Sequence, residues 1–233
     1  MNLNDINCSE YLNDENNIFN VLSTNEKSTL LNNHILSSYK RNNIIFKEGE
    51  IPNSILLLIE GKVKILKKGI GSRSQILRMT KPIDIIGYRA LLADEPYISS
   101  AVALEDTIIF AFDKNKFKEL IHSNNDFATN IIKLLASELG FSNKKIVALT
   151  QKHIRGRLAE TLLFLKNTYG FDEDNCTLNI CLSREDLANL SNMTTSNAIR
   201  TLSTFASEDV ISVKGRKIKI KNYKKLQKIN DLG

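Results

Sequence analysis

Small hydrogen-bonding side chains gather in the stretch Leu182–Phe205, where two short helical patterns flank a polar turn. A 3.6-residue period puts four of these side chains on the outer side of the second helix, near its start. Hydroxyl, amide and guanidinium groups there can hydrogen-bond the edges of DNA bases, where asparagine suits adenine and arginine suits guanine. The four residues are Thr195, Ser196, Asn197 and Arg200.

Two helices joined by a short turn are predicted around these residues. Ser183 favours the N-cap of the first helix and is also counted among the candidate DNA-binding residues. The second helix is predicted to begin near Thr194 or Thr195. The residues predicted to face inward are Leu187, Ala188 and Leu190 in the first helix, and Ala198, Ile199, Leu202 and Phe205 in the second. A threonine-rich cap is also typical of ordinary surface helices, so the surrounding sequence has to decide the function.

A basic segment follows the two helices. Between Val210 and Lys228 there are eight basic residues and no acidic one. Alternating apolar residues on both sides of Lys214-Gly215 predict a β-hairpin, with Lys214 and Arg216 at its tip. The segment could be a solvated tail, but a basic hairpin next to a candidate base-reading helix favours a polyanionic partner.

The last third of the chain, residues 151–233, is predicted to form one unit. An amphipathic helix is predicted over residues 152–169, closed by Gly170 as its C-cap. The alternating segment Cys176–Leu182 predicts a short strand. The order of these elements indicates a winged helix-turn-helix, which is a DNA-binding unit: helix, strand, helix, turn, helix and basic hairpin.

Short alternating segments fill residues 39–113 and predict a β domain. In "KVKILK", for example, Val63 and Ile65 alternate with lysines, as in a half-buried strand. Many such segments, separated by turn signals roughly every 8–12 residues, are typical of a β-sandwich, jelly roll or barrel. Asp113 is then predicted to cap a helix over residues 114–123.

A long helix is predicted from Asn125 to about Thr150, between the two candidate domains. It carries seven residues spaced alternately four and three apart, which is a three-heptad seam with one polar interruption. The seam could be a core-packing stripe or a surface for self-association, and its place between two domains favours the second interpretation. The seven residues are Ala128, Ile132, Leu135, Leu139, Ser142, Ile146 and Leu149.

Composition supports this α+β organisation into residues 1–124, 125–150 and 151–233. The 233 residues carry a net charge of +6; residues 1–150 hold 18 basic and 17 acidic residues, and residues 151–233 hold 14 and 9. The positive excess is therefore concentrated beside the predicted helix pair. No apolar run is long enough to span a membrane, the polar N-terminus is not that of a signal peptide, and three unpaired cysteines suit a reducing cytoplasm.

The chain resembles the Crp/Fnr family of bacterial transcription regulators over nearly its whole length. The resemblance rests on "IFKEGEIPNSILLLIEGKVKIL", "DIIGYRALLADEPYISSAVALED", "RGRLAETLL" and "LSREDLANLSNMTTSNAIRTL". It implies a jelly-roll sensor domain, a long dimerisation helix and a C-terminal winged helix. It further implies a homodimer that binds an inverted repeat in double-stranded DNA and acts with RNA polymerase. Arg184 occupies the place of a phosphate-contacting arginine of the family.

The resemblance also shows where the sequence departs from the family. The best-known relative has an Arg-Glu pair at the place of Thr195-Ser196, so we expect a different DNA sequence to be bound. Members that bind cyclic AMP use a Gly-Glu pair for the ribose and an Arg-Ser pair for the phosphate. Here Tyr88 follows Gly87, and Tyr97 stands about where the phosphate arginine is expected.

A cyclic phosphate needs a buried cation or several N–H donors, so we expect an effector other than cyclic AMP. The candidate effector pocket comprises Gly87, Tyr88, Arg89, Tyr97, Ser99 and Ser100. An iron–sulfur cluster like that of some members needs four cysteines, and only Cys8 lies in the predicted sensor domain. Haem stays open as an alternative, with His34, His122 and Met79 as possible axial ligands.

Two further classes of protein fit the sequence less well. A metal-dependent jelly-roll enzyme would need clustered histidines with a carboxylate, and His34, His122 and His153 are far apart in the sequence. We therefore expect neither a metal site nor an enzyme. A sensor module that acts on a protein partner is the other alternative, and the basic hairpin argues against it.

Overall fold

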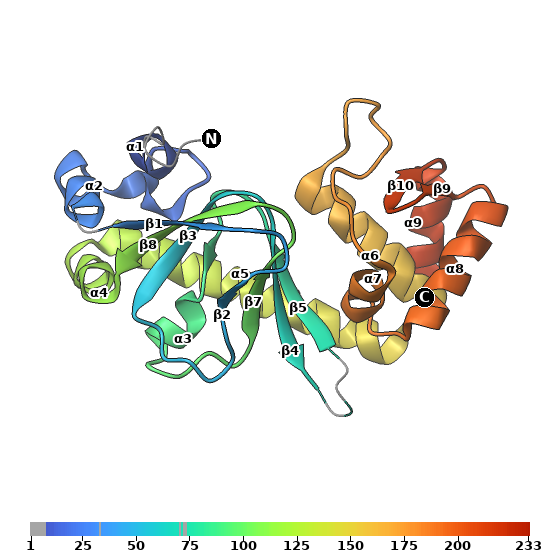
Figure 1. Cartoon of the computed structure of the whole chain (residues 1–233), viewed down its shortest axis with the longest axis horizontal. Coiled ribbons are helices and arrows are strands. Elements are labelled where there is room, and N and C mark those ends of the chain that lie inside the picture. The colour runs from blue at the N-terminus through green and yellow to red at the C-terminus, as the bar shows by residue number, and fades with distance from the viewer. Residues whose placement is uncertain (1–7, 33, 70, 72–73) are drawn as a thin grey trace. The chain divides into compact units, whose positions relative to one another are not determined.

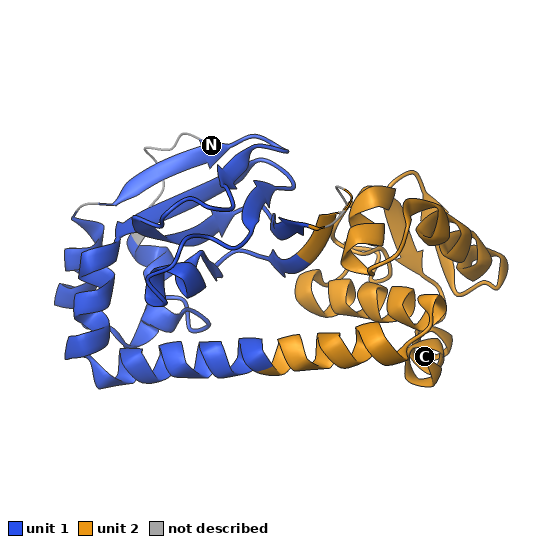
Figure 2. Cartoon of the chain, turned by 90° about the horizontal axis from the view of Figure 1, so that it is seen from below, with its two compact units in different colours: residues 1–68, 77–139 blue, residues 69–76, 140–233 orange. Residues whose placement is uncertain are grey.

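The computed structural model describes residues 8–32, 34–69, 71 and 74–233. The chain divides into two compact units, residues 1–68 with 77–139 and residues 69–76 with 140–233 (Figure 2). The long helix predicted between the domains is α5, Asn125–Gln151, and the boundary between the units falls inside it, between Leu139 and Gly140.

The first unit combines β-strands with short helices (Figure 1). Its strands are β1 (Ile35–Tyr39), β2 (Ile44–Phe46), β3 (Ser54–Glu60), β4 (Val63–Lys68), β5 (Ser74–Thr80), β6 (Ile85–Ile86), β7 (Ser100–Ala103) and β8 (Thr107–Asp113). Its helices before α5 are α1 (Cys8–Leu12), the 3-10 helix η2 (Ile18–Val21), α2 (Thr24–Leu31), α3 (Tyr88–Leu92) and α4 (Lys114–Ser123). Asp113 caps α4, as its sequence position predicts.

The strands form two four-stranded sheets with the orders β1-β8-β3-β6 and β2-β7-β4-β5. Apolar side chains from both sheets meet in one core, among them Phe46, Val63 and Ala101 from the second sheet and Leu58 and Ile109 from the first. Two sheets packed across a shared apolar core are the architecture that the short alternating segments predict.

A second core lies on the other face of the sheet β1-β8-β3-β6. There Phe110 and Phe112 of β8 pack against helical residues, and Phe19 of η2 stacks on Phe127 of α5 with ring centroids 5.5 Å apart. Ile131, one turn further along α5, is buried in the same cluster. The N-terminal part of α5 is therefore fixed to the β unit by the side chains at Phe127 and Ile131.

The second unit is built around a helical core. Its elements after α5 are α6 (Ile154–Tyr169), α7 (Arg184–Leu190), α8 (Thr195–Ser207), β9 (Ile211–Lys214), β10 (Lys217–Ile220) and α9 (Tyr223–Leu232). Strands β9 and β10 form the predicted hairpin, with Lys214 opposite Lys217 next to the turn. Gly215 adopts φ 60° in that turn, a conformation that glycine tolerates best.

Two predictions about this unit are wrong or incomplete. Cys176–Leu182 is not a strand, because it pairs only through isolated bridges such as Thr177 with Lys219. Helix α9, which Asn222 caps and which buries Leu226 completely, was not predicted from the sequence. The basic run therefore ends in a packed helix rather than a tail. Among the residues described, no helix is long and apolar enough to cross a membrane.

Candidate functional site

The helix pair α7 and α8 begins at two hydrogen-bonding caps. The Ser183 hydroxyl oxygen accepts from the Asp186 amide at 2.9 Å and donates to its carboxylate at 2.8 Å. The Thr194 hydroxyl oxygen likewise accepts from the Asn197 amide at 3.2 Å. Both caps satisfy amide groups that a helix start leaves without a partner inside the helix. Ser183, which the sequence analysis included among the DNA-binding residues, is thus occupied in capping α7.

The turn between the helices is fixed to α6. Asn192 adopts φ 51°, and the Met193 amide donates back to the Ala188 carbonyl at 3.0 Å. The Ser191 hydroxyl donates to the Thr161 hydroxyl at 2.9 Å in the interior. Arg157 of α6 donates to the Asn192 carbonyl at 3.3 Å. These contacts, which the local sequence does not reveal, hold α8 in one orientation on its unit.

The two faces of α8 differ sharply in burial. Thr195, Ser196 and Arg200 are exposed and Asn197 is half-buried, on the side that the period predicts. The buried face consists of Ala198, Thr201, Leu202 and Phe205. Placing Ile199 on that face was wrong, because Thr201 is buried instead and the Ile199 side chain is 47% exposed. On a 3.6-residue period Ile199 lies one turn from Ser196 and Ser203, which are both exposed.

Arg200 is held in position by its own helix. Its Nη2 donates to Asn197 Oδ1 at 2.9 Å, between residues three apart in sequence. Such pairs are neighbours on a helix surface. Because arginine has five N–H donors, the contact leaves other donors available for a ligand.

The tip of the β9–β10 hairpin carries exposed Lys214 and Arg216. Arg184, at the start of α7, donates from Nη2 to the Gly215 carbonyl at 2.8 Å. Its Nη1 is buried and has no hydrogen-bond partner among the residues described. Arg184 therefore joins the helix pair to the tip of the hairpin, and this contact was not foreseen from its place in the sequence.

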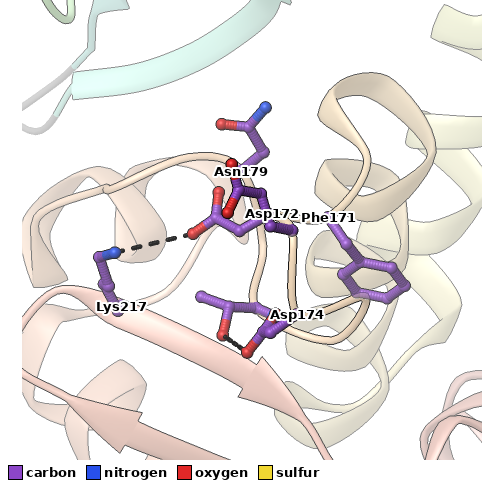
Figure 3. Close-up of a pocket in the computed structure, with 7 residues that line it drawn as sticks. Phe171, Asp172, Asp174, Asn179 and Lys217 are labelled. Carbon is purple, nitrogen blue, oxygen red and sulfur yellow. Dashed lines mark hydrogen bonds and ion pairs between the residues drawn. The ribbon is translucent and has the colours of Figure 1, made fainter.

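The loop before α7 forms an open pocket of about 620 Å³, shown in Figure 3. Lys217 lies 3.7 Å from the Asp172 carboxylate, and Asp174 accepts hydrogen bonds from the Thr177 amide and hydroxyl at 2.8 and 2.7 Å. The Thr177 amide is the main cause that holds the pKa of Asp174 well below its usual range. The carboxylates of this loop would disfavour a phosphate backbone, so the pocket is not counted with the candidate interface of α8 and the hairpin tip.

Two of the candidate effector residues, Gly87 and Tyr97, are in close contact inside the first unit. The Tyr97 ring is buried and stacks on Phe46, with centroids 3.8 Å apart. A Cβ atom added at Gly87 would lie 3.1 Å from the Tyr97 hydroxyl, so ring and glycine are in close contact. Burial raises the pKa of Tyr97 to about 12.

Tyr88 is the second buried phenol of this region. Its hydroxyl oxygen accepts from Nη1 of Arg78 in β5 at 2.6 Å, and burial raises its pKa to about 12. The other terminal nitrogen of Arg78 lies 3.4 Å from the Glu138 carboxylate of α5. Arg78 could not be identified from local sequence spacing, because its partners are 10 and 60 residues away along the chain.

The remaining candidate effector residues are Arg89, Ser99 and Ser100. Arg89 is exposed, and its guanidinium group pairs with the Glu95 carboxylate at 2.8 Å. Ser99 is buried, and the Ser100 hydroxyl oxygen accepts from the Glu48 amide at 2.9 Å.

The three residues considered as haem ligands lie in separate places. His34 precedes β1, with Nδ1 2.6 Å from the Leu31 carbonyl oxygen, His122 is exposed on α4, and Met79 is buried in β5. Among the residues described, no group of three or more His, Cys, Asp or Glu side chains could hold a metal ion.

The seam of α5 is exposed along most of its length. Ile132, Leu139 and Ile146 are 65%, 63% and 58% exposed. Leu135 and Ser142 are also exposed, and Ala128 and Leu149 are half-buried. The helix buries other residues, Phe127 and Ile131 in the first unit and Ala148 in the second. The seam is therefore not the stripe by which α5 packs into either core.

A double-sheet unit, a long helix and a winged helix-turn-helix with a basic tip define a class of DNA-binding transcription regulators. Residues 36–124 match the model of the cyclic nucleotide-binding domain, and residues 156–229 match the Crp-like helix-turn-helix domain. These two matches cover most of the chain, and it belongs to the Crp/Fnr family of transcription regulators. Members of this family are transcription regulators rather than enzymes, as the sequence predicts.

Similar proteins support the same assignment. The chain is 24% identical over 189 residues to the CRP-like cAMP-activated global transcriptional regulator of Mycobacterium tuberculosis, covering 81% of this chain and 84% of that protein. It is 28% identical over 176 residues to the anaerobic regulatory protein of Bacillus subtilis, covering 75% and 74%. The structure of FixK2 from Bradyrhizobium japonicum shares the fold with a TM-score of 0.76 and 21% identity, covering 85% and 98%.

Proposed function

We propose that this Crp/Fnr-type regulator acts in the cytoplasm as a homodimer that binds an inverted-repeat DNA site. The observation that supports it best is the outward face of α8, where Thr195, Ser196 and Arg200 are exposed and Asn197 holds the guanidinium group. Polar side chains near the N-terminus of such a helix reach base edges in the major groove. The operator is expected to differ from that of the best-known family member, because two of these positions carry other residue types.

In this proposal the base contacts and the phosphate contacts come from different elements. Arg200 binds a guanine through its O6 and N7 acceptors, for which a guanidinium fork is well matched. Lys214 and Arg216 at the hairpin tip contact phosphates, which strengthen binding without selecting a sequence. Arg184 holds the hairpin tip beside the helix pair through the Gly215 carbonyl, so both kinds of contact are made in a fixed relation.

The proposed dimer forms through the seam of α5. Exposed apolar residues spaced alternately four and three apart are what a two-stranded coiled coil buries between its helices. Two parallel copies would bring two α8 helices to the same side of one duplex. Half-sites would then lie about one helical turn apart, ~34 Å, which requires an inverted repeat. On a promoter, the bound dimer would act with RNA polymerase.

We further propose that the effector is a small molecule other than cyclic AMP. The Tyr97 ring occupies the space beside Gly87, and Arg78 is engaged by Tyr88 and Glu138. A cyclic phosphate would have to displace a buried ring and acquire a cation that already has two partners. In this proposal an effector would reach Gly87 by displacing Tyr97 from its stack on Phe46.

One experiment tests the proposed DNA binding. The full-length protein is used to select from a pool of randomised duplexes, and the selected sequence is measured for affinity at several salt concentrations. We expect an inverted repeat whose logarithmic affinity falls linearly with the logarithm of salt concentration, because phosphate contacts release counterions. Selection of no motif, or of a single unrepeated half-site, would contradict the proposal.

A further inference from the structure

We propose that Ile199 is a specificity-determining residue, which selects a thymine next to the base that Arg200 contacts. This inference rests on the proposed function, because it concerns the same face of α8. It goes beyond that function in naming the base and the chemical group, the C5-methyl of thymine, that the isoleucine recognises.

The position of Ile199 is the first argument. Its side chain is 47% exposed, while Ala198, Thr201, Leu202 and Phe205 supply the buried face of the helix. Thr195 and Ser196 lie one turn before it and Arg200 directly follows, so Ile199 is surrounded by the side chains proposed to contact bases. A contact made by these neighbours brings Ile199 to the same groove.

The chemistry of the groove is the second argument. Among the groups that base pairs present in the major groove, hydrogen-bond donors and acceptors predominate, and the thymine C5-methyl is the apolar one. An isoleucine pressed against a donor or acceptor would remove it from water without replacing the hydrogen bond, which is unfavourable. Against a thymine methyl it buries apolar surface on both sides. The same side chain thus attracts thymine and disfavours the other bases.

The local geometry is the third argument. The Ser203 hydroxyl, one turn further on, donates to the Ile199 carbonyl at 3.1 Å, so it is turned toward the helix backbone. Asn197 holds the Arg200 guanidinium on the N-terminal side at 2.9 Å. Neither of these two hydrogen bonds crosses the exposed side chain of Ile199. A β-branched residue also has little χ1 freedom in a helix. Ile199 therefore presents a rigid apolar surface.

The test compares thymine with deoxyuridine, which lacks only the C5-methyl group. Each thymine of the selected site is replaced in turn by deoxyuridine, and the affinities of the wild type and of Ile199→Ala are measured. We expect one position per half-site at which the wild type loses affinity about fourfold, or about 15-fold when both half-sites are changed. Ile199→Ala should bind the two duplexes equally at that position.

A second arm asks whether the methyl group alone is sufficient. Cytosine at the same position should bind more weakly than thymine, and 5-methylcytosine should recover part of the loss for the wild type but none for Ile199→Ala. Ile98→Ala is the matched control, because Ile98 is 46% exposed in the first unit. It should keep the full deoxyuridine effect.

The outcomes separate this inference from the function on which it rests. A selected inverted repeat with no deoxyuridine effect at any thymine would overturn the role of Ile199 and leave the regulator function in place. An effect that persists in Ile199→Ala would assign the methyl contact to another residue and would equally overturn the inference. Failure to select any motif would overturn both.

Discussion

The guanidinium group of Arg200 and the side-chain amide of Asn197 form a 2.9 Å hydrogen bond on the outward face of α8. The contact orders a long, flexible side chain before any ligand arrives. Ordering such a side chain upon binding costs about 0.5–1.5 kcal/mol, so the bond lowers that cost for Arg200. Asn197 thus positions Arg200, whether or not it also reaches a base.

Replacing Arg200 should change which sequence is bound. Arg200→Ala is expected to cost ~1–3 kcal/mol on the selected site and to relax the preference at one base pair per half-site. Selection from randomised DNA with wild type and variant measures both effects. An unchanged motif would mean that α8 does not read the base through Arg200. Asn197→Ala is the companion variant, and it should keep the same preferred base while binding more weakly.

Replacing Lys214 should weaken binding without changing the sequence preference. Phosphate contacts are the same on every sequence, so Lys214→Ala should lower affinity for specific and random duplexes about equally. The slope of affinity against salt concentration should fall by roughly one unit per subunit. Titrations at two salt concentrations measure it. A change in the selected motif would show instead that the hairpin tip reads bases.

A charge at the centre of the α5 seam should separate the subunits. Leu139→Glu would bury two carboxylates opposite each other in a parallel dimer, which is strongly unfavourable. We expect sedimentation as a monomer and loss of inverted-repeat binding. Ser137→Glu, on the same helix but outside the seam, should remain dimeric. A Leu139→Glu protein that still sediments as a dimer would rule out this interface.

Cyclic AMP at millimolar concentration should neither bind measurably nor be required for DNA binding. The Tyr97 ring lies 3.8 Å from that of Phe46, centroid to centroid, next to Gly87 where the nucleotide would have to enter. Isothermal calorimetry with DNA-binding-competent protein is the measurement. Micromolar affinity would show that Tyr97 moves aside and that a cation meets the phosphate.

The buried phenol of Tyr97 should make the first unit less stable at high pH. Its pKa is about 12 in the folded chain and about 10 in an unfolded one. Above pH 10 the unfolded state loses a proton that the folded state keeps, so the free energy of unfolding falls as pH rises towards 12. The loss reaches roughly 2–3 kcal/mol, and none of it occurs below pH 10. Denaturant unfolding of Tyr97→Phe should show a shallower decline over this range, and an equal decline would contradict the burial.

Local sequence patterns predicted the elements of the fold well where one face is buried. Asp113, Ser183 and Gly170 mark helix ends that the structure has at those residues. The prediction of a strand at Cys176–Leu182 was wrong because alternation of apolar and polar residues alone does not make a strand. This segment lacks a continuous partner, and only isolated bridges such as Thr177 with Lys219 form.

The candidate site was predictable only as far as local spacing determines it. The 3.6-residue period identified the outward side of α8. Ile199 was predicted on the wrong face because its apolar side chain was given more weight than its position around the helix axis. Contacts between distant segments, such as Arg78 with Tyr88 and Arg184 with Gly215, cannot be read from spacing at all. They depend on which turns and sheets bring the partners together.

The bond from Arg184 to Gly215 is made to a main-chain carbonyl, so it does not depend on the side chains of Lys214 and Arg216. Side chains at the hairpin tip can therefore change over generations without moving the hairpin. Substitution of Lys214 or Arg216 during evolution could change the affinity for DNA. The orientation of α8 would stay the same. Affinity and sequence choice would then be separately adjustable traits of one small domain.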